Sequence, residues 1–130
     1  MPDYANRTLM NEATLAAVST VPATIAGTEC SVMDLTDIDD FALTVECEFA
    51  TLATGNAVFR VFTSPTGAPT DAGVWDTEAY CDGTLTCVAA TRVQKTIVIE
   101  GDPKYAKVTV ENKDAAKAIY DVVVRKVTTR

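Results

Sequence analysis

Apolar and polar side chains alternate with a period of two along much of this chain. In the segment 41–49 every second residue is apolar, and the positions between them are mostly polar or charged. The segment 105–111 repeats the pattern, with Ala106, Val108 and Val110 on one side. Such alternation is typical of β-strands that bury one face. In residues 95–130 β-branched residues dominate and no 3.6-residue apolar stripe appears, which disfavours helix there.

Read in this way, the pattern predicts strands at 30–35, 41–49, 57–64, 74–80, 84–93, 97–99, 105–111 and 119–125. Thr54-Gly55-Asn56 and Asp82-Gly83 are expected to close hairpins, because these residues favour tight turns. Turns at 101–103 and 112–116 would make residues 95–130 a three-stranded β-meander. The regular spacing of short strands predicts an all-β fold: an antiparallel, jelly-roll-like β-sandwich of about seven or eight strands.

Residues 1–28 differ from the rest, because they are rich in Ala and Thr and hold only scattered larger apolar residues, among them Leu9, Met10 and Leu15. We therefore expect an extended N-terminal arm (1–28) followed by one β-sandwich domain (29–130), since 130 residues suffice for a single core. The arm either packs on its own sheet or reaches a neighbouring molecule.

Three apolar residues fall on the nominally outer strand faces: Val98, Ile119 and Val123. Either another segment of the chain covers them, or they form a subunit contact. Together with Leu9, Met10 and Leu15 they are our candidates for a partner interface.

The charge balance narrows the choice of partners. The net charge of −7 would be repelled by phosphate backbones and anionic lipid, so neither nucleic acid nor membrane is expected as a partner. The apolar runs are too short to span a bilayer, and the first residues, with Asp3, do not resemble a signal peptide. We expect synthesis in a host cytoplasm without export.

Four cysteines, Cys30, Cys47, Cys81 and Cys87, allow three disulfide pairings. A two-residue turn at 82–83 would direct Cys81 and Cys87 to opposite faces, which disfavours a bond between them. Cytoplasmic synthesis favours free thiols, and a bond formed later outside the cell is the alternative.

Residues with catalytic potential are few. The chain has no histidine, which excludes Ser-His-Asp and Cys-His arrangements, and the cysteine spacing does not match a zinc site. Asp34, Asp37, Asp39 and Asp40 could gather oxygens around Ca²⁺, but an acidic turn is the ordinary interpretation. The pair Glu46 and Glu48 imitates a glycosidase pair, but a charged strand face explains it equally simply. We expect no enzyme activity, no cofactor and no metal.

Trp75, the only tryptophan, follows a loop rich in Pro, Gly and Thr. Its ring could stack on a sugar, as in a carbohydrate-binding module, or pack at the end of a sheet.

Several segments together resemble small virion proteins of tailed bacteriophages, particularly capsid decoration (cement) proteins. The similarity lies in Val32-Met33-Asp34-Leu35 after an Ala/Thr-rich start, in RVFTSPTGAPTDAGVWDT (60–77), and in the ending 105–112 with 120–125. It spans most of residues 29–127.

The resemblance implies a non-enzymatic, jelly-roll-like subunit, a homotrimer, seated on the lattice of the major capsid protein at the virion head surface. A trimer with several contacts gains avidity without new chemistry. A tail, neck or fibre component and a carbohydrate-binding module are the alternatives.

Overall fold

The computed structural model describes residues 7–35, 40–64, 75–100 and 105–128, and within these ranges it contains nine β-strands and no helix. The strands are β1 (Arg7–Leu15), β2 (Thr20–Val21), β3 (Met33–Asp34), β4 (Asp40–Phe49), β5 (Ala57–Ser64), β6 (Cys81–Leu85), β7 (Arg92–Glu100), β8 (Tyr105–Asn112) and β9 (Ile119–Thr128). The predicted all-β class is confirmed. No helix in the described ranges is therefore long enough to cross a bilayer.

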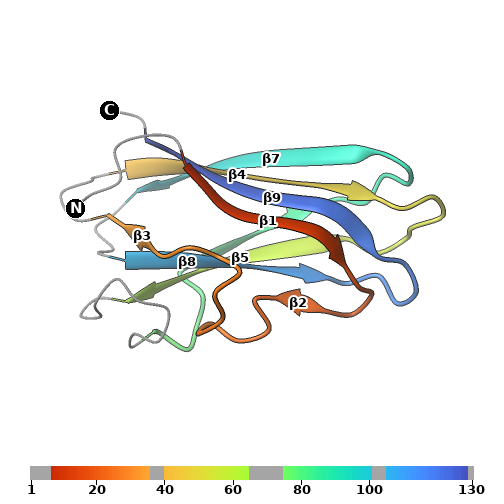
Figure 1. Ribbon diagram of the computed structural model, residues 1–130. Helices are drawn as coiled ribbons and strands as arrows, with labels where there is room; N and C mark the ends of the chain where they lie inside the picture. Colours follow the sequence, from red (N-terminus) through yellow and green to blue (C-terminus); the bar gives the residue numbers. More distant parts are fainter. Residues whose placement is uncertain (1–6, 36–39, 65–74, 101–104, 129–130) are drawn as a thin grey trace.

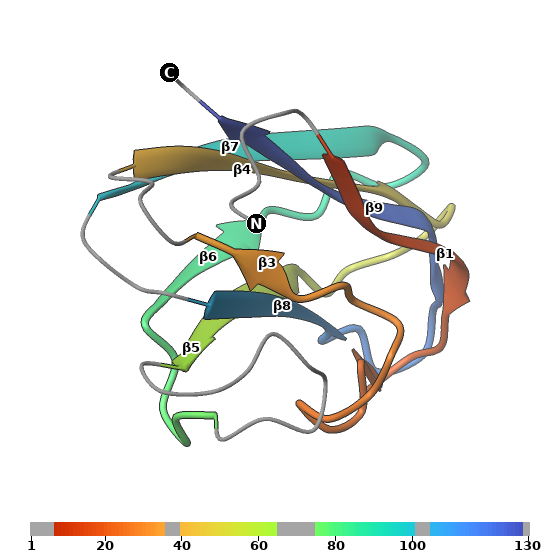
Figure 2. The same ribbon diagram turned by 60° about the vertical axis from the view of Figure 1, so that its left-hand side comes forward.

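Two antiparallel sheets face each other (Figures 1 and 2). The first sheet has the order β1-β9-β4-β7, and the second has the order β2-β8-β5-β6, with β3 also paired to β8. The chain changes sheet six times: between β1 and β2, β3 and β4, β4 and β5, β6 and β7, β7 and β8, and β8 and β9. This winding is that of a jelly roll, so the predicted sandwich architecture is confirmed as well.

Two predicted local pairings are wrong. Residues 95–130 do not form a meander, because β7 and β9 flank β4 in the first sheet while β8 lies in the second. The Thr54-Gly55-Asn56 segment likewise joins strands of opposite sheets instead of closing a hairpin. The alternation of apolar residues reports which face of a strand is buried, and it says nothing about which strand lies beside it.

The predicted hairpin at Asp82-Gly83 is also absent, since both residues lie inside β6. Residues 75–80 form no strand, and the predicted strand 84–93 is interrupted between Leu85 and Arg92. Gly83 pairs with Phe59 of β5, and a Cβ atom built on Gly83 would clash with the Cζ atom of that ring. The glycine therefore marks a close approach between a buried ring and a strand backbone, a common reason for glycine within strands.

Leu9, Met10 and Leu15 belong to the hydrophobic core, because residues 7–15 form the edge strand β1 beside β9. The register between these strands shifts between Thr8 and Met10, which places the adjacent side chains of Leu9 and Met10 both inside. We left open whether the N-terminal segment packs on its own sheet or reaches a neighbouring molecule. Its described part, residues 7–28, packs on its own sandwich, because β1 belongs to the first sheet and β2 to the second. A boundary at residue 28 does not separate them from the sandwich.

The predicted facing of β9 is wrong at its start. Opposite Glu46–Glu48 of β4, strand β9 accommodates an extra residue, and Asp121 has a φ of 48°. This β-bulge shifts the alternation, so Ile119 is fully buried in the core although its position relative to Val122 and Val124 suggested the outer face.

The close packing at Gly83 predicts a specific sensitivity. Gly83→Ala forces a methyl group against the Phe59 ring, and overpacking of this kind costs about 1–3 kcal/mol. We expect a lower free energy of unfolding in denaturant titrations. Thr84→Ala, at an exposed position of the same strand, is the control. An unchanged stability of Gly83→Ala would mean that the ring and the strand are not in this contact.

Candidate functional site: the loop end of the sandwich

Four connecting segments meet at one end of the sandwich, at the right of Figure 1: residues 16–19, 50–56, 86–91 and 113–118. We call this end the loop end. Backbone hydrogen bonds tie the segments together: Val18 N donates to Asp114 O (3.1 Å) and Ala90 N to Ala50 O (3.1 Å). Lys113 N donates to Asn56 O at 2.9 Å. The loop end is thus one connected framework.

Asn112, at the end of β8, is a buried centre of this framework. Its amide nitrogen lies within hydrogen-bonding distance of the carbonyl oxygens of Leu15 (3.3 Å), Ala16 (3.2 Å) and Lys117 (2.9 Å). Its amide oxygen accepts from the backbone N–H of Asp114 at 3.0 Å. A buried amide with all these partners holds the ends of β1 and β8 and the start of β9 in fixed positions.

The buried Asp114 carboxylate completes the framework. One oxygen accepts from the N–H groups of Thr54 (2.7 Å) and Gly55 (2.9 Å), and the other from those of Ala116 and Lys117 (both 2.8 Å). Hydrogen bonds from these four N–H groups hold the pKa of Asp114 well below its usual range. The charged carboxylate therefore joins the β4–β5 loop to the β8–β9 loop.

Large aliphatic side chains project from this framework into solvent. Val18 is 71% exposed, Leu52 74% and Val88 51%, and each lies in a different loop. Val18 and Leu52 also have positive φ angles, 57° and 68°, which are unfavourable for residues with bulky side chains. Residues held in such conformations depend on their surroundings, and they cluster at functional sites.

A shallow cavity of about 390 Å³ opens beside these loops. Among its lining residues are Glu48 and Phe49 at the end of β4, Ala90, Lys117, and the exposed Tyr120 at the start of β9. The cavity thus combines an aromatic side chain with one acidic and one basic group. Of the residues that the sequence singled out, Glu48 lines this cavity and Cys87 lies in segment 86–91, but neither was expected to take part in a binding surface here.

The interface candidates from the sequence are not brought together on one surface. Leu9, Met10, Leu15 and Ile119 are buried in the core, and Val123 is only 8% exposed. Val98 is the exception, because its side chain is 60% exposed on β7. Burial explains the hydrophobic character of the first five without a partner. Val98 remains as an exposed apolar residue on an edge strand.

Trp75 is half-buried, and the Lys107 ammonium lies 5.9 Å from the centre of its ring, within the range of a cation–π contact. The same ammonium donates to the carbonyl oxygens of Ile25 (2.7 Å) and Gly27 (2.6 Å). Lys107 thus connects β8 to the segment between β2 and β3. Sugar stacking by Trp75 stays a prediction.

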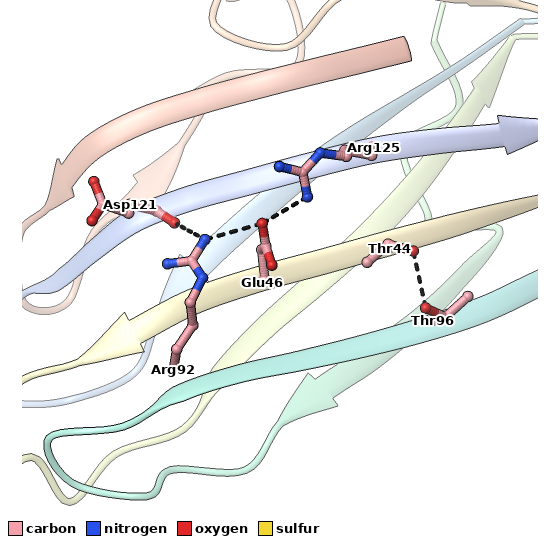
Figure 3. A network of polar contacts seen from close by, with 6 residues as sticks. All are labelled: Thr44, Glu46, Arg92, Thr96, Asp121 and Arg125. Atoms are coloured by element: carbon pink, nitrogen blue, oxygen red, sulfur yellow. Dashed lines mark hydrogen bonds and ion pairs between the residues drawn. The ribbon is translucent and has the colours of Figure 1, made fainter. Parts of the chain in front are cut away.

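Glu46 lies on the outer face of the first sheet between two arginines (Figure 3). Its Oε1 atom is 2.7 Å from Arg125 Nη1 and 3.0 Å from Arg92 Nη2. Burial raises the pKa of Glu46, but the hydrogen bonds and charges of the arginines outweigh it and lower the pKa below its ordinary value. A catalytic acid needs the opposite shift, so this geometry favours the interpretation of Glu46 as a structural group on a charged face.

The four cysteines are thiols in the structure. Burial raises the pKa of Cys47 to about 12, and it also raises the pKa values of Cys81 and Cys87, with contributions from nearby Asp82 and Asp114. Such thiols react slowly. There is no turn at 82–83, and Cys81 pairs with Val61 near one end of β5 while Cys87 N donates to Asn56 Oδ1 just before the other end. This separation along β5 prevents a disulfide for a different reason from the one we expected.

Metal-binding geometry is absent from the described ranges, in which no three Cys, Asp or Glu side chains gather. Of the acidic turn, Asp37 and Asp39 lie outside the described residues, as does the side chain of Asp40.

No protein-family model matches this chain, and no curated protein sequence matches it. Among solved structures, the globular domain of zebrafish complement 1qA is similar over 97% of this chain and 98% of its own, with 11% identity and a TM-score of 0.48. The CBM22-1 and GH10 modules of Clostridium thermocellum xylanase 10B match with 10% identity and a TM-score of 0.47 over 98% of this chain and 29% of that one. The CBM22-1 xylan-binding domain of Paenibacillus barcinonensis Xyn10C matches with 11% identity and a TM-score of 0.38, over 98% and 99% of the two chains.

The Asp114 contacts predict a pH-dependent stability. A carboxylate whose folded pKa is depressed stabilises the fold above its unfolded pKa, and this contribution is lost as the pH falls below about 4. In Asp114→Asn an amide N–H₂ replaces one acceptor and faces backbone donors. We expect a lower Tm at neutral pH and a smaller loss of Tm on acidification than in the wild type.

The measurement is thermal unfolding from neutral to acidic pH, with Asp82→Asn, at an exposed position, as the control. Equal pH profiles of wild type and Asp114→Asn would contradict this role of Asp114.

Proposed function

We propose that this chain is a non-enzymatic structural protein of a tailed-bacteriophage virion, a capsid decoration protein that binds a shell of major capsid protein through its loop end. The observation that carries the proposal is the set of exposed aliphatic side chains, Val18, Leu52 and Val88, on a hydrogen-bonded framework. Several exposed apolar side chains at one end of a folded domain favour contact with another protein.

The framework gives these groups an energetic advantage in binding. Loops that are already ordered lose little conformational entropy when a partner is bound, so more of the interaction energy appears as affinity. The neighbouring Lys113 and Lys117 are exposed and provide a polar rim of positive charge. A capsid surface that is apolar at its centre and acidic around it would fit this end.

The rest of the molecule suits a surface subunit. The net charge of −7 would keep densely coated particles from associating. Several copies joined in an oligomer would bind a lattice with avidity even if each loop end bound weakly. A tail, neck or fibre location is the alternative within this class, and it differs only in which virion part the protein binds.

A carbohydrate-binding module is the second candidate, and the cavity beside Tyr120 favours it. An exposed aromatic side chain near Glu48 and Lys117 offers both stacking and hydrogen bonding to a sugar. A glycan array separates the candidates. Binding that is lost in Tyr120→Ala or Trp75→Ala would support this function, and an array without hits would remove it.

The proposed interface predicts the effect of a double substitution, Val18→Asp with Leu52→Asp. Loss of two central apolar contacts and the added charge should weaken co-sedimentation with undecorated capsids at least tenfold, or about 1.4 kcal/mol. The fold should be kept, because Asp tolerates a positive φ better than Val or Leu does.

Thr84→Asp, at an exposed position on β6, is the matched control. If the double variant co-sediments like the wild type while the control does too, the loop end is not the binding surface. If the wild type binds tails or fibres but not capsids, the head location is wrong.

A further inference from the structure

Strand β7 is a long border of the first sheet whose outer edge has no strand partner within the described residues (Figures 1 and 2). It spans Arg92–Glu100, with the sequence RVQKTIVIE and no proline or glycine. Open edges of this length pair readily with another chain, and proteins commonly shorten, bend or interrupt them. The unpaired backbone groups of this regular nine-residue edge therefore favour pairing with a strand of another chain.

The hydrogen bonds to β4 show which residues of β7 have N–H and C=O groups that point toward the outer edge. Phe49 N of β4 donates to Thr91 O at 3.0 Å, so the odd-numbered residues of this segment direct their backbone groups toward β4. In an antiparallel sheet the direction alternates from residue to residue. The N–H and C=O groups of Arg92, Gln94, Thr96 and Val98 therefore point outward. The Tyr80 hydroxyl, which donates to Glu100 O at 2.7 Å, fits the same alternation.

We propose that β7 pairs with β7 of a second copy of this chain, antiparallel and across a two-fold axis at Thr96. This register brings together residues whose backbone groups point outward: Thr96 with Thr96, Gln94 with Val98, and Arg92 with Glu100. Glu100 O, which already accepts from the Tyr80 hydroxyl, would use its second lone pair for Arg92 N of the other copy. The two sheets then continue as one eight-stranded sheet with β4, β9 and β1 on both sides.

Charge complementarity favours a second copy as the occupant. In this register each Arg92 faces a Glu100 of the other copy, once at each end of the contact, and opposite charges directly across a strand pair are stabilising. In the single chain Arg92 reaches over β4 to Glu46 and to the Asp121 carbonyl, away from the outer edge of β7 (Figure 3). Its guanidinium would therefore leave these two partners to pair with Glu100 of the second copy. Shifting the register by two residues would remove both charge pairs.

The side chains fit as well. On the outer face the hydroxyls of Thr44 and Thr96, 2.9 Å apart, would extend into a row of four threonines across the axis. Val98, the exposed apolar residue of this strand, would lie against Gln94 of the other copy. On the inner face Val93 would meet Ile99. The contact would thus cover the exposed part of β7 while the loop end stays open for another partner.

The test uses the full chain alone, without capsids, so that its outcome is independent of the proposed function. Sedimentation velocity across the micromolar to millimolar range should show the 13.8-kDa chain associating into a species of twice that mass. Hydrogen exchange should show amides of Gln94, Thr96 and Val98 becoming protected as the concentration rises, while that of Ile97 is protected throughout.

Thr96→Pro removes an outward N–H and leaves pairing with β4 intact, because proline is tolerated at the free side of an edge strand. We expect it to be monomeric with an unchanged circular dichroism spectrum. Thr96→Val keeps the N–H, removes the hydroxyl and should remain dimeric. Glu100→Lys should weaken the dimer at least tenfold, since it places like charges together.

A wild type that stays monomeric, or that forms only trimers, would overturn the proposal. So would a folded Thr96→Pro variant that still dimerises. If Thr96→Pro does not fold, Glu100→Lys decides, and a dimer affinity equal to that of the wild type would reject this register.

Discussion

The structure depends on one constraint: every buried N–H and C=O group needs a hydrogen-bond partner. In a jelly roll the chain crosses between sheets repeatedly, and each crossing leaves backbone N–H and C=O groups that no strand pairs. At the loop end Asn112 and Asp114 supply the missing partners for three of the four connecting segments. The fourth, 86–91, is joined through Asn56, whose amide oxygen accepts from Cys87 N at 2.8 Å. Two side chains from one turn thus organise a whole end of the molecule.

This framework explains how aliphatic side chains can remain in solvent. Val18 and Leu52 have backbone conformations that residues of their type avoid, and neighbouring hydrogen bonds such as Val18 N to Asp114 O keep the loops in place. An ordered apolar surface of this kind differs from the scattered exposed residues found on every protein. In our proposals this end binds a partner through apolar side chains, whereas the edge of β7 binds a second copy through backbone groups.

Sequence reasoning succeeded where a strand alternates without interruption. The segments 41–49, 57–64 and 105–111 agree closely with β4, β5 and β8, because burial of one face dictates their pattern. It failed at Asp82-Gly83, where glycine accommodates the Phe59 ring instead of a turn. It failed again at Ile119, because the bulge at Asp121 shifts the alternation of β9.

The candidate site illustrates the same division. Asp114 and Asn112 look like ordinary turn residues in the sequence, and their importance comes from partners that are as many as 97 residues away. By itself, the sequence determined the strand class, the sandwich architecture and much of the core, since these follow from local period and hydrophobicity. Only the tertiary structure decided which strands are neighbours, which apolar residues are exposed, and where the loops meet. Those features arise from contacts between distant segments, which no local pattern records.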